Sequence, residues 1–330
     1  MRILVLGGTR FLGHAVAAEG VRRGHEVVCA ARGSSGVPEG ARLVKVDRDL
    51  EDGLAPLRGE RFDAVVDVAT ISYEWVQRAL AEFGATAKHW TFVSSISVYA
   101  DPGAEPTGIG DPVLEPRAVH GTREGMASDP NLYGAVKVAG ERAVLDAAGD
   151  RAFIVRAGLI TGPGDEFDRF GYWVQRLARG GRVVVPDVDH QSQFVDVRDL
   201  ANWIVDAGER GTTGVYDGIG PVVPLLDLLA DIAEVLGSEV EFVRVSEADL
   251  RANGVAPWMG PRSLPFWLPT GYHKMSARDA GPALAAGLTP MPLADAVAGA
   301  LAHERSLDPN RVRKAGLTPD EETEILQRVG

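Results

Sequence analysis

The stretch MRILVLGGTRFLG, residues 1–13, decides the fold of this chain. Within it, Arg2–Leu6 is a short apolar run typical of a buried strand, and Phe11–Glu19 has the pattern of the first turns of a helix. A turn rich in glycine joins the two. Strand, glycine-rich turn and helix in this order form the first unit of a dinucleotide-binding βαβ motif, although such a turn also closes ordinary strands.

The turn has the spacing G-x-x-G-x-x-G, with Gly7 first, Gly13 last and Arg10 in place of the middle glycine. Glycines let backbone N–H groups approach a pyrophosphate, and the helix N-terminus adds partial positive charge. We therefore expect this turn to bind a dinucleotide. The residues expected to contact it are Gly7, Thr9, Arg10, Phe11, Leu12 and Gly13.

The composition limits the possible partners. The chain has 330 residues, of which 45% are hydrophobic and 24% charged, and its net charge is −12. An acidic surface repels nucleic acids, and we see no apolar run long enough to cross a membrane. The single Cys29 excludes an internal disulfide framework, and no cluster of cysteine and histidine suggests a metal. We expect a cytoplasmic protein, a monomer or a homodimer, without nucleic-acid, membrane or metal partners.

Apolar strand patterns alternate with helical patterns through the first half of the chain. The expected strands are Arg2–Leu6, Glu26–Ala30, Leu43–Val46, Ala64–Val68, Trp90–Ser94 and Ala152–Arg156. Continuous runs of this kind are typical of parallel strands buried on both faces. The alternation predicts an α/β fold with a Rossmann-type, doubly wound parallel sheet.

The second half predicts a smaller C-terminal substrate lobe. We expect a dinucleotide-binding domain over residues 1–165, its sheet completed by parts of 182–220, and a lobe with C-terminal helices over 166–330. The segment Tyr99–Pro130 is rich in proline, glycine and acidic residues and predicts a long loop. The helices expected after Gly164 are Phe167–Arg179, Val197–Glu209, Pro224–Leu236 and Leu293–Glu304, and the expected strands are Arg182–Pro186, Gly214–Asp217 and Glu239–Val245.

The chemistry is expected from Tyr133 and Lys137, which form a Y-x-x-x-K pattern. On a helix these positions share a face, so the lysine charge would lower the pKa of the tyrosine and suit it for proton transfer. Ser95 stands where an apolar strand ends in a hydroxyl cluster, and ligands bind beyond such strand ends. The alternative for Tyr133 and Lys137 is that both simply lie on the surface of a helix. The alternative for Ser95 is that its hydroxyl only satisfies backbone groups at the strand end.

Taken together, six segments resemble the extended short-chain dehydrogenase/reductases, the NAD-dependent epimerase/dehydratase family. They are VLGGTRFLG (5–13), FDAVVDVAT (62–70), FVSSISVYA (92–100), YGAVKVAGE (133–141), VRAGLITGPGD (155–165) and FVDVRDLA (194–201). The glycine-rich opening and AGLTPMPL (286–293) resemble a branch that includes actinobacterial reductases and plastid stem-loop-binding proteins.

The resemblance implies roles for particular residues. Ser95, Tyr133 and Lys137 would be the catalytic set, and Tyr133 and Lys137 would also contact the cofactor. Asp47, with Arg48 beside it, would lie near the adenine. The peptide Val68-Ala69-Thr70 would line the nicotinamide ribose.

Two departures point away from nucleotide-sugar substrates. Family members with such substrates often have an asparagine after the arginine of the VR segment, but Ala157-Gly158-Leu159-Ile160 follows Arg156. They also often have an arginine before the aromatic residue of the last segment, where this chain has Ser192 and Gln193. A diphosphate needs cationic donors of that kind.

The cofactor expected is NADP(H), with NAD(H) possible. NAD enzymes place an acidic residue at the end of the second strand, where this chain has Ala31 and Arg32. The substrate contacts expected are Ser97, Tyr172 and Trp258, although aromatic residues of a lobe are more often core.

We interpret the chain as an NAD(P)-dependent oxidoreductase that transfers hydride at a carbonyl or alcohol carbon of a small molecule. A redox-neutral epimerase or dehydratase of a sugar-like substrate is the first alternative. A non-catalytic RNA-binding member of the fold is the second.

Overall fold

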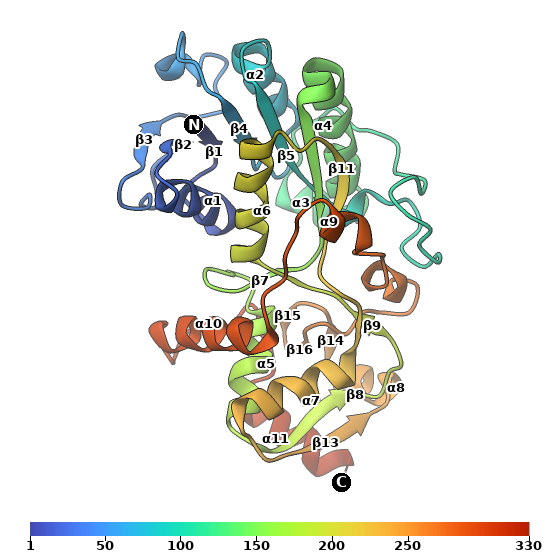
Figure 1. Ribbon diagram of the computed structural model, residues 1–330. Coiled ribbons are helices and arrows are strands. Elements are labelled where there is room, and N and C mark those ends of the chain that lie inside the picture. Colours follow the sequence, from blue (N-terminus) through green and yellow to red (C-terminus); the bar gives the residue numbers. More distant parts are fainter. Residues whose placement is uncertain (330) are drawn as a thin grey trace.

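The computed structural model describes residues 1–329, which form a parallel sheet between helices and a smaller C-terminal lobe (Figure 1). In spatial order the sheet consists of β11 (Gly214–Gly218), β6 (Ala152–Ala157), β5 (His89–Ser95), β4 (Ala64–Asp67), β1 (Arg2–Leu6), β2 (Glu26–Ala31) and β3 (Arg42–Lys45). Every neighbouring pair is parallel. The predicted Rossmann-type fold is confirmed, and each predicted strand of this sheet ends within one residue of the observed one.

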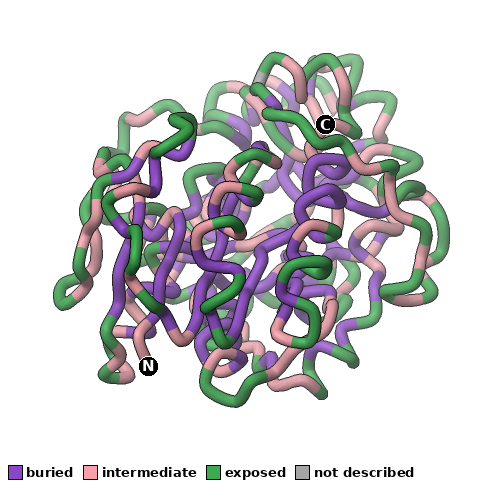
Figure 2. Tube along the Cα trace, turned by 90° about the horizontal axis from the view of Figure 1, so that it is seen from above, coloured by how far each residue is buried: buried purple, intermediate pink, exposed green. Residues whose placement is uncertain are grey.

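Helices cover both faces of the sheet. They are α1 (Phe11–Arg22) and α6 (Val197–Arg210) on one face, and α2 (Tyr73–Phe83) and α4 (Leu132–Ala148) on the other. Side chains alternate along each strand, so Ile3 and Val5 pack on the α1 face while Leu4 and Leu6 pack on the α2 face. Burial on both faces explains why the strands are apolar throughout, and Figure 2 shows buried chain along them.

The strand order reverses at β1, which pairs with β2 on one side and β4 on the other. The connection after β1 leads to β2 on one side, and the connection after β4 leads to β5 on the other side. The two loops therefore separate at the carboxyl ends of β1 and β4. In open α/β sheets a ligand crevice forms at this point. The topology therefore places the glycine-rich turn after β1 at the mouth of such a crevice.

The C-terminal lobe is built around a second, two-stranded parallel pair, β8 (Gly181–Pro186) with β13 (Val240–Val245). Its apolar core includes the fully buried Trp173 and Trp267. The lobe helices are α5 (Arg169–Ala178), α7 (Leu225–Leu236), α8 (Glu247–Ala252), α10 (Leu293–Ser306) and α11 (Pro319–Val329). The short helix α9 (Gly281–Ala285) instead returns to the large sheet, where Ala283 joins the core on the α6 face. From the 182–220 segment, β11 joins the large sheet, whereas β8 belongs to this pair.

Short elements connect the two parts. The two-residue strands are β7 (Ile160–Thr161), β9 (Gln191–Ser192), β10 (Val195–Asp196), β12 (Val223–Pro224), β14 (Ala256–Pro257), β15 (Gly260–Pro261), β16 (Ser263–Leu264) and β17 (Ala315–Gly316). The predicted long loop after β5 contains the short helix α3 (Arg123–Ser128), and Tyr99 pairs with Val113 near its start. No helix within residues 1–329 has the length and apolar character needed to cross a membrane.

Candidate active site

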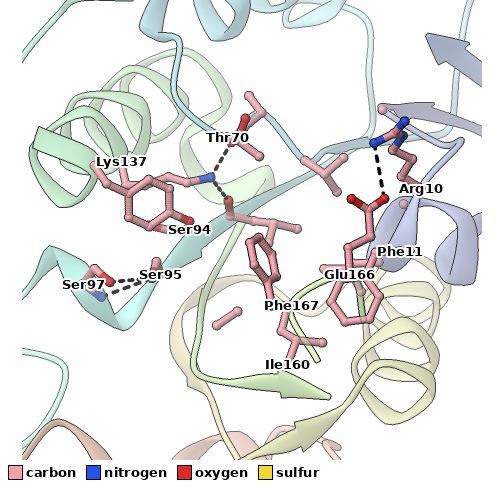
Figure 3. Close-up of a pocket in the computed structure, with 18 of the residues that line it drawn as sticks. Arg10, Phe11, Thr70, Ser94, Ser95, Ser97, Lys137, Ile160, Glu166 and Phe167 are labelled. Atoms are coloured by element: carbon pink, nitrogen blue, oxygen red, sulfur yellow. Dashed lines mark hydrogen bonds and ion pairs between the residues drawn. The ribbon is translucent and has the colours of Figure 1, made fainter. Parts of the chain in front are cut away.

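A cleft of about 1130 Å³ lies beyond the carboxyl ends of the sheet strands and is lined by both parts of the molecule. The sheet domain contributes Gly7 and Lys137, and the lobe contributes Trp258 and Tyr272. Drug-sized ligands occupy about 300–1,000 Å³. The cleft therefore has room for a dinucleotide together with a small substrate. Figure 3 shows part of its lining.

The glycine-rich turn forms one end of the cleft and is built by close backbone contact. Gly7 has a φ of +99°, which favours glycine, and a Cβ on Gly13 would lie 2.2 Å from the Gly7 carbonyl oxygen. Arg10 precedes α1 and has no side-chain oxygen with which to cap the first N–H groups of that helix. These N–H groups suit a pyrophosphate. The geometry fits a dinucleotide at this turn.

Lys137 is buried in the middle of the cleft wall. Its Nζ donates a 2.7 Å hydrogen bond to the Val93 carbonyl oxygen and another to the Ala69 carbonyl oxygen (Figure 3). Burial lowers the pKa of Lys137 to about 8, while the charges of Asp67 and Glu141 act in the opposite direction. The ammonium thus ties the ends of β4 and β5 together.

Arg48 lines the cleft, but its guanidinium is used inside the protein. It donates to both carboxylate oxygens of the fully buried Asp67, at 2.8 and 2.9 Å, and to the Trp75 carbonyl oxygen at 2.6 Å. Asp67 in turn accepts a 2.9 Å hydrogen bond from the Ala69 N–H. Arg48 therefore fixes the peptide that Lys137 contacts, whereas the sequence assigned it directly to the cofactor.

Tyr133 and Ser95 lie on the same part of the cleft as Lys137. Burial raises the pKa of Tyr133, and its interactions with the Ser95 hydroxyl and the Arg169 charge act against that rise. The Lys137 Nζ lies 5.7 Å from the centre of the Tyr133 ring. Arg169 is thus a cation whose charge opposes the rise in the pKa of Tyr133, and the role of Lys137 toward the tyrosine stays a prediction. Ser95 Oγ also donates to Ser97 Oγ at 3.1 Å.

The end of the cleft near β2 carries two arginines and no carboxylate from that strand. Ala31 and Arg32 both line it, as does Asp47 after β3. Arg10 Nε donates a 3.3 Å hydrogen bond to Ser35 Oγ, and its Nη1 lies 3.3 Å from a carboxylate oxygen of Glu166. Figure 3 shows this ion pair spanning from the glycine-rich turn to the loop before α5.

The predicted substrate residues fall in different places. Ser97 and Trp258 line the cleft. Tyr172 does not reach it: the residue is 2% exposed in the core of the lobe, and its ring packs against Trp173. Of the residues of α5, Arg169 lines the cleft, whereas Tyr172 lies in the lobe core. The other predicted residues that line the cleft are Thr9, Phe11, Leu12, Val68 and Ala69.

Comparison with known proteins identifies the family. Residues 3–81 and 74–217 match the model of the NAD dependent epimerase/dehydratase family. The chain belongs to this family. The resemblance found in the sequence is confirmed. The cleft beside the glycine-rich turn is consistent with a family named for NAD dependence.

Two relatives of this family member are reductases from Streptomyces. It is 28% identical over 228 residues to a 3-diazoavenalumate denitrifying reductase of a Streptomyces species, a match that covers 65% of this chain and 74% of that protein. It is 29% identical over 197 residues to the 2′-dehydrokanamycin reductase of Streptomyces kanamyceticus, covering 57% of this chain and 52% of that protein. The solved UDP-N-acetylglucosamine 4-epimerase of Bacillus cereus has the same fold, with a TM-score of 0.67 at 17% identity over 95% of this chain and 99% of that chain.

Sequence reasoning missed Glu166, Phe167 and Arg169, which all line the cleft. The pattern placed Phe167 inside a helix, but α5 begins at Arg169 because Asp168 adopts a φ of +63°. The loop before α5 places Glu166 against Arg10 of the glycine-rich turn and Arg169 against the Phe167 and Trp258 rings. Among residues 1–329, no group of three or more histidine, cysteine, aspartate or glutamate side chains is arranged to hold a metal.

The lowered pKa of Lys137 predicts how stability depends on pH. Between pH 8 and about 10.5 the folded protein has lost this proton while the unfolded chain retains it, so stability rises with pH. We expect the free energy of unfolding of the wild type, relative to Lys137→Met, to increase by about 1.4 kcal/mol per pH unit within this window. Urea denaturation of the cofactor-free proteins at each pH measures it.

Lys88→Met is the matched control, because the Lys88 side chain is 80% exposed and pairs with Asp63 at the surface. The difference in free energy of unfolding between the wild type and Lys137→Met should rise over this pH range. A difference that stays constant or falls would contradict the lowered pKa of Lys137.

Proposed function

We propose that this chain is an NADP(H)-dependent reductase that acts on the carbonyl group of a small molecule without a nucleotide. The observation that carries the proposal is the grouping of Ser95, Tyr133 and Lys137 on one wall of a cleft that also contains the glycine-rich turn. The two Streptomyces relatives, both named as reductases, support reduction over epimerisation. No observation favours an RNA-binding role for this acidic chain.

The residues of the wall divide the chemistry between them. The bound cofactor supplies hydride to the carbonyl carbon. The Tyr133 hydroxyl donates its proton to the carbonyl oxygen, and the Ser95 hydroxyl orients that oxygen by a hydrogen bond. Lys137 contacts the cofactor ribose while holding the Ala69 and Val93 carbonyls. A positive charge near Tyr133 stabilises its phenolate after the proton has left, and Arg169 supplies such a charge.

The proposal of a substrate without a nucleotide rests on Gln193 and Arg278, whose polar groups are not free to bind a diphosphate. Gln193, which stands in place of a phosphate-binding arginine, donates to the Gly220 and Arg278 carbonyl oxygens at 3.0 and 2.6 Å. The Arg278 guanidinium donates to Asp217 at 2.7 Å and to Asp111 at 3.0 Å. Both side chains are used within the protein, so neither offers the bidentate grip that a diphosphate needs.

The preference for NADP(H) rests on the charge beside β2. Arg32 lines the cleft directly after the strand, where an acidic side chain would repel a 2′-phosphate and accept from a 2′-hydroxyl. Arg10 lies on the same side, bonded to Ser35. These two guanidinium groups would bind the phosphate.

Removal of the Tyr133 hydroxyl tests the catalytic role. Tyr133→Phe keeps the ring but removes the proton donor, and general acid catalysis contributes about 10²–10⁴-fold. Turnover should fall by that order while affinity for NADPH barely changes. The measurement is NADPH oxidation with a panel of ketones, aldehydes and keto-sugars. Tyr73→Phe, on α2 away from the cleft, is the control, and full turnover by Tyr133→Phe would contradict the mechanism.

Removal of the Arg32 charge tests the cofactor preference. A hydrogen bond to a charged group contributes about 1.5–3 kcal/mol, so Arg32→Ala should bind NADPH at least about tenfold more weakly. Affinity for NADH should stay the same, as should both affinities in Arg58→Ala, where the lost arginine is exposed and distant. Calorimetric titration measures them. Equal affinity of the wild type for the two cofactors would refute the preference.

A further inference from the structure

Arg169 is a cation at the substrate side of the cleft that no carboxylate reaches at hydrogen-bonding distance. It is the first residue of α5, its side chain is 13% exposed, and it lines the cleft with Tyr133 and Trp258. Its Nε is buried and finds no hydrogen-bond acceptor within residues 1–329. The carboxylate nearest in its ion pair, Asp165 Oδ1, is 3.9 Å from Nη2, too far for a hydrogen bond.

Four other arginines of the chain with buried side chains differ from Arg169 in having a carboxylate at hydrogen-bonding distance. Each has a carboxylate oxygen within 2.5–2.9 Å, and the pairs are Arg48 with Asp67, Arg156 with Glu141, Arg176 with Glu322 and Arg278 with Asp217. Burial of a charge without such a partner is costly. A ligand that supplies an anion at Arg169 would offset the free energy lost by burying this charge.

Aromatic rings hold the Arg169 guanidinium in place without satisfying its N–H groups. Its Cζ lies 5.0 Å from the centre of the Phe167 ring and 5.4 Å from that of Trp258. Rings contact the faces of a guanidinium, whereas its five N–H groups lie in the plane and suit a planar carboxylate. This leaves the edge of the guanidinium for a ligand.

The backbone around this group is strained on both sides. Asp168, the residue before Arg169, has a φ of +63°, and Trp258 has a φ of +69°. Asp168 is held there by a 2.6 Å ion pair with Arg311 and a 2.7 Å hydrogen bond from the Lys314 N–H. Strain of this kind is retained mainly at functional sites.

We propose that Arg169 binds the carboxylate of the substrate, so that the chain reduces the carbonyl group of a small organic acid. This inference deepens the proposed function and rests on it for the reaction. Arg169 and Tyr133 line the same cleft, so one small substrate can place its carboxylate at the first and its carbonyl oxygen at the second. The lining also includes the apolar side chains of Met126, Met259, Met275 and Leu268, which suit an aromatic or aliphatic body.

The test compares two ligands that differ only in charge. Benzoylformate and its amide, benzoylformamide, are titrated into the NADPH-bound protein, and binding is followed by the fluorescence of the bound cofactor. The wild type should bind the acid at least about tenfold more tightly, the lower end for a charge-assisted hydrogen bond. Arg169→Gln should lose this preference, and Arg169→Lys should keep part of it. Arg179→Gln, at the C-cap of the same helix and outside the cleft, should keep all of it.

The same preference in the wild type and in Arg169→Gln would overturn the inference, as would a wild type that binds neither ligand or both alike. A variant that shifts only the pH profile of turnover would show that Arg169 tunes Tyr133 without binding the substrate, which also overturns it. Acid-selective binding without any hydride transfer would leave the carboxylate site standing and contradict the proposed reductase. The two proposals therefore fail separately.

Discussion

The contact between Gly13 and the Gly7 carbonyl oxygen is the constraint on which the rest of this structure depends. A Cβ at Gly13 would lie 2.2 Å from that oxygen, so only glycine lets α1 start this close to β1. The close start directs the first N–H groups of the helix into the crevice where the strand order reverses. The positions of Lys137, Tyr133 and Ser95 have a function only relative to a dinucleotide bound at that turn.

Buried charge is distributed in two ways around the cleft. On the sheet side, Asp67 neutralises Arg48 and fixes the Ala69 peptide, and that peptide and the Val93 carbonyl hold the Lys137 ammonium. In this support the Arg48 charge has a carboxylate at hydrogen-bonding distance and the Lys137 ammonium has two carbonyl acceptors. On the substrate side, Arg169 has only aromatic faces and a carboxylate at 3.9 Å. A hydrogen-bonded support and, across the cleft, a cation without a hydrogen-bonded carboxylate are the arrangement expected of a site that positions a cofactor and selects an anionic substrate.

The sequence predicted the sheet closely because buried parallel strands are continuous apolar runs, which few other structures produce. It predicted the glycine-rich turn because close backbone approach requires glycines at a fixed spacing. It predicted Tyr133 with Lys137 because residues four apart share one face of a helix. It missed Arg169 because the start of α5 depends on the φ of Asp168, which tertiary ion pairs hold. It placed Tyr172 at the substrate because burial in a lobe core cannot be read from local spacing, and the pairing of Arg48 with Asp67 depends on a distant segment for the same reason.

The measurement that tests the central claim most directly is calorimetric titration of NADPH into Gly13→Val, with Gly110→Val as the matched control. No atom beyond the chain neighbours lies within 4 Å of a Cβ at Gly110, whereas a side chain at Gly13 must push the turn open. With circular dichroism showing that both variants are folded, binding should be lost in Gly13→Val and unchanged in Gly110→Val. Wild-type affinity in Gly13→Val would contradict the placement of the cofactor and, with it, the site built around the turn.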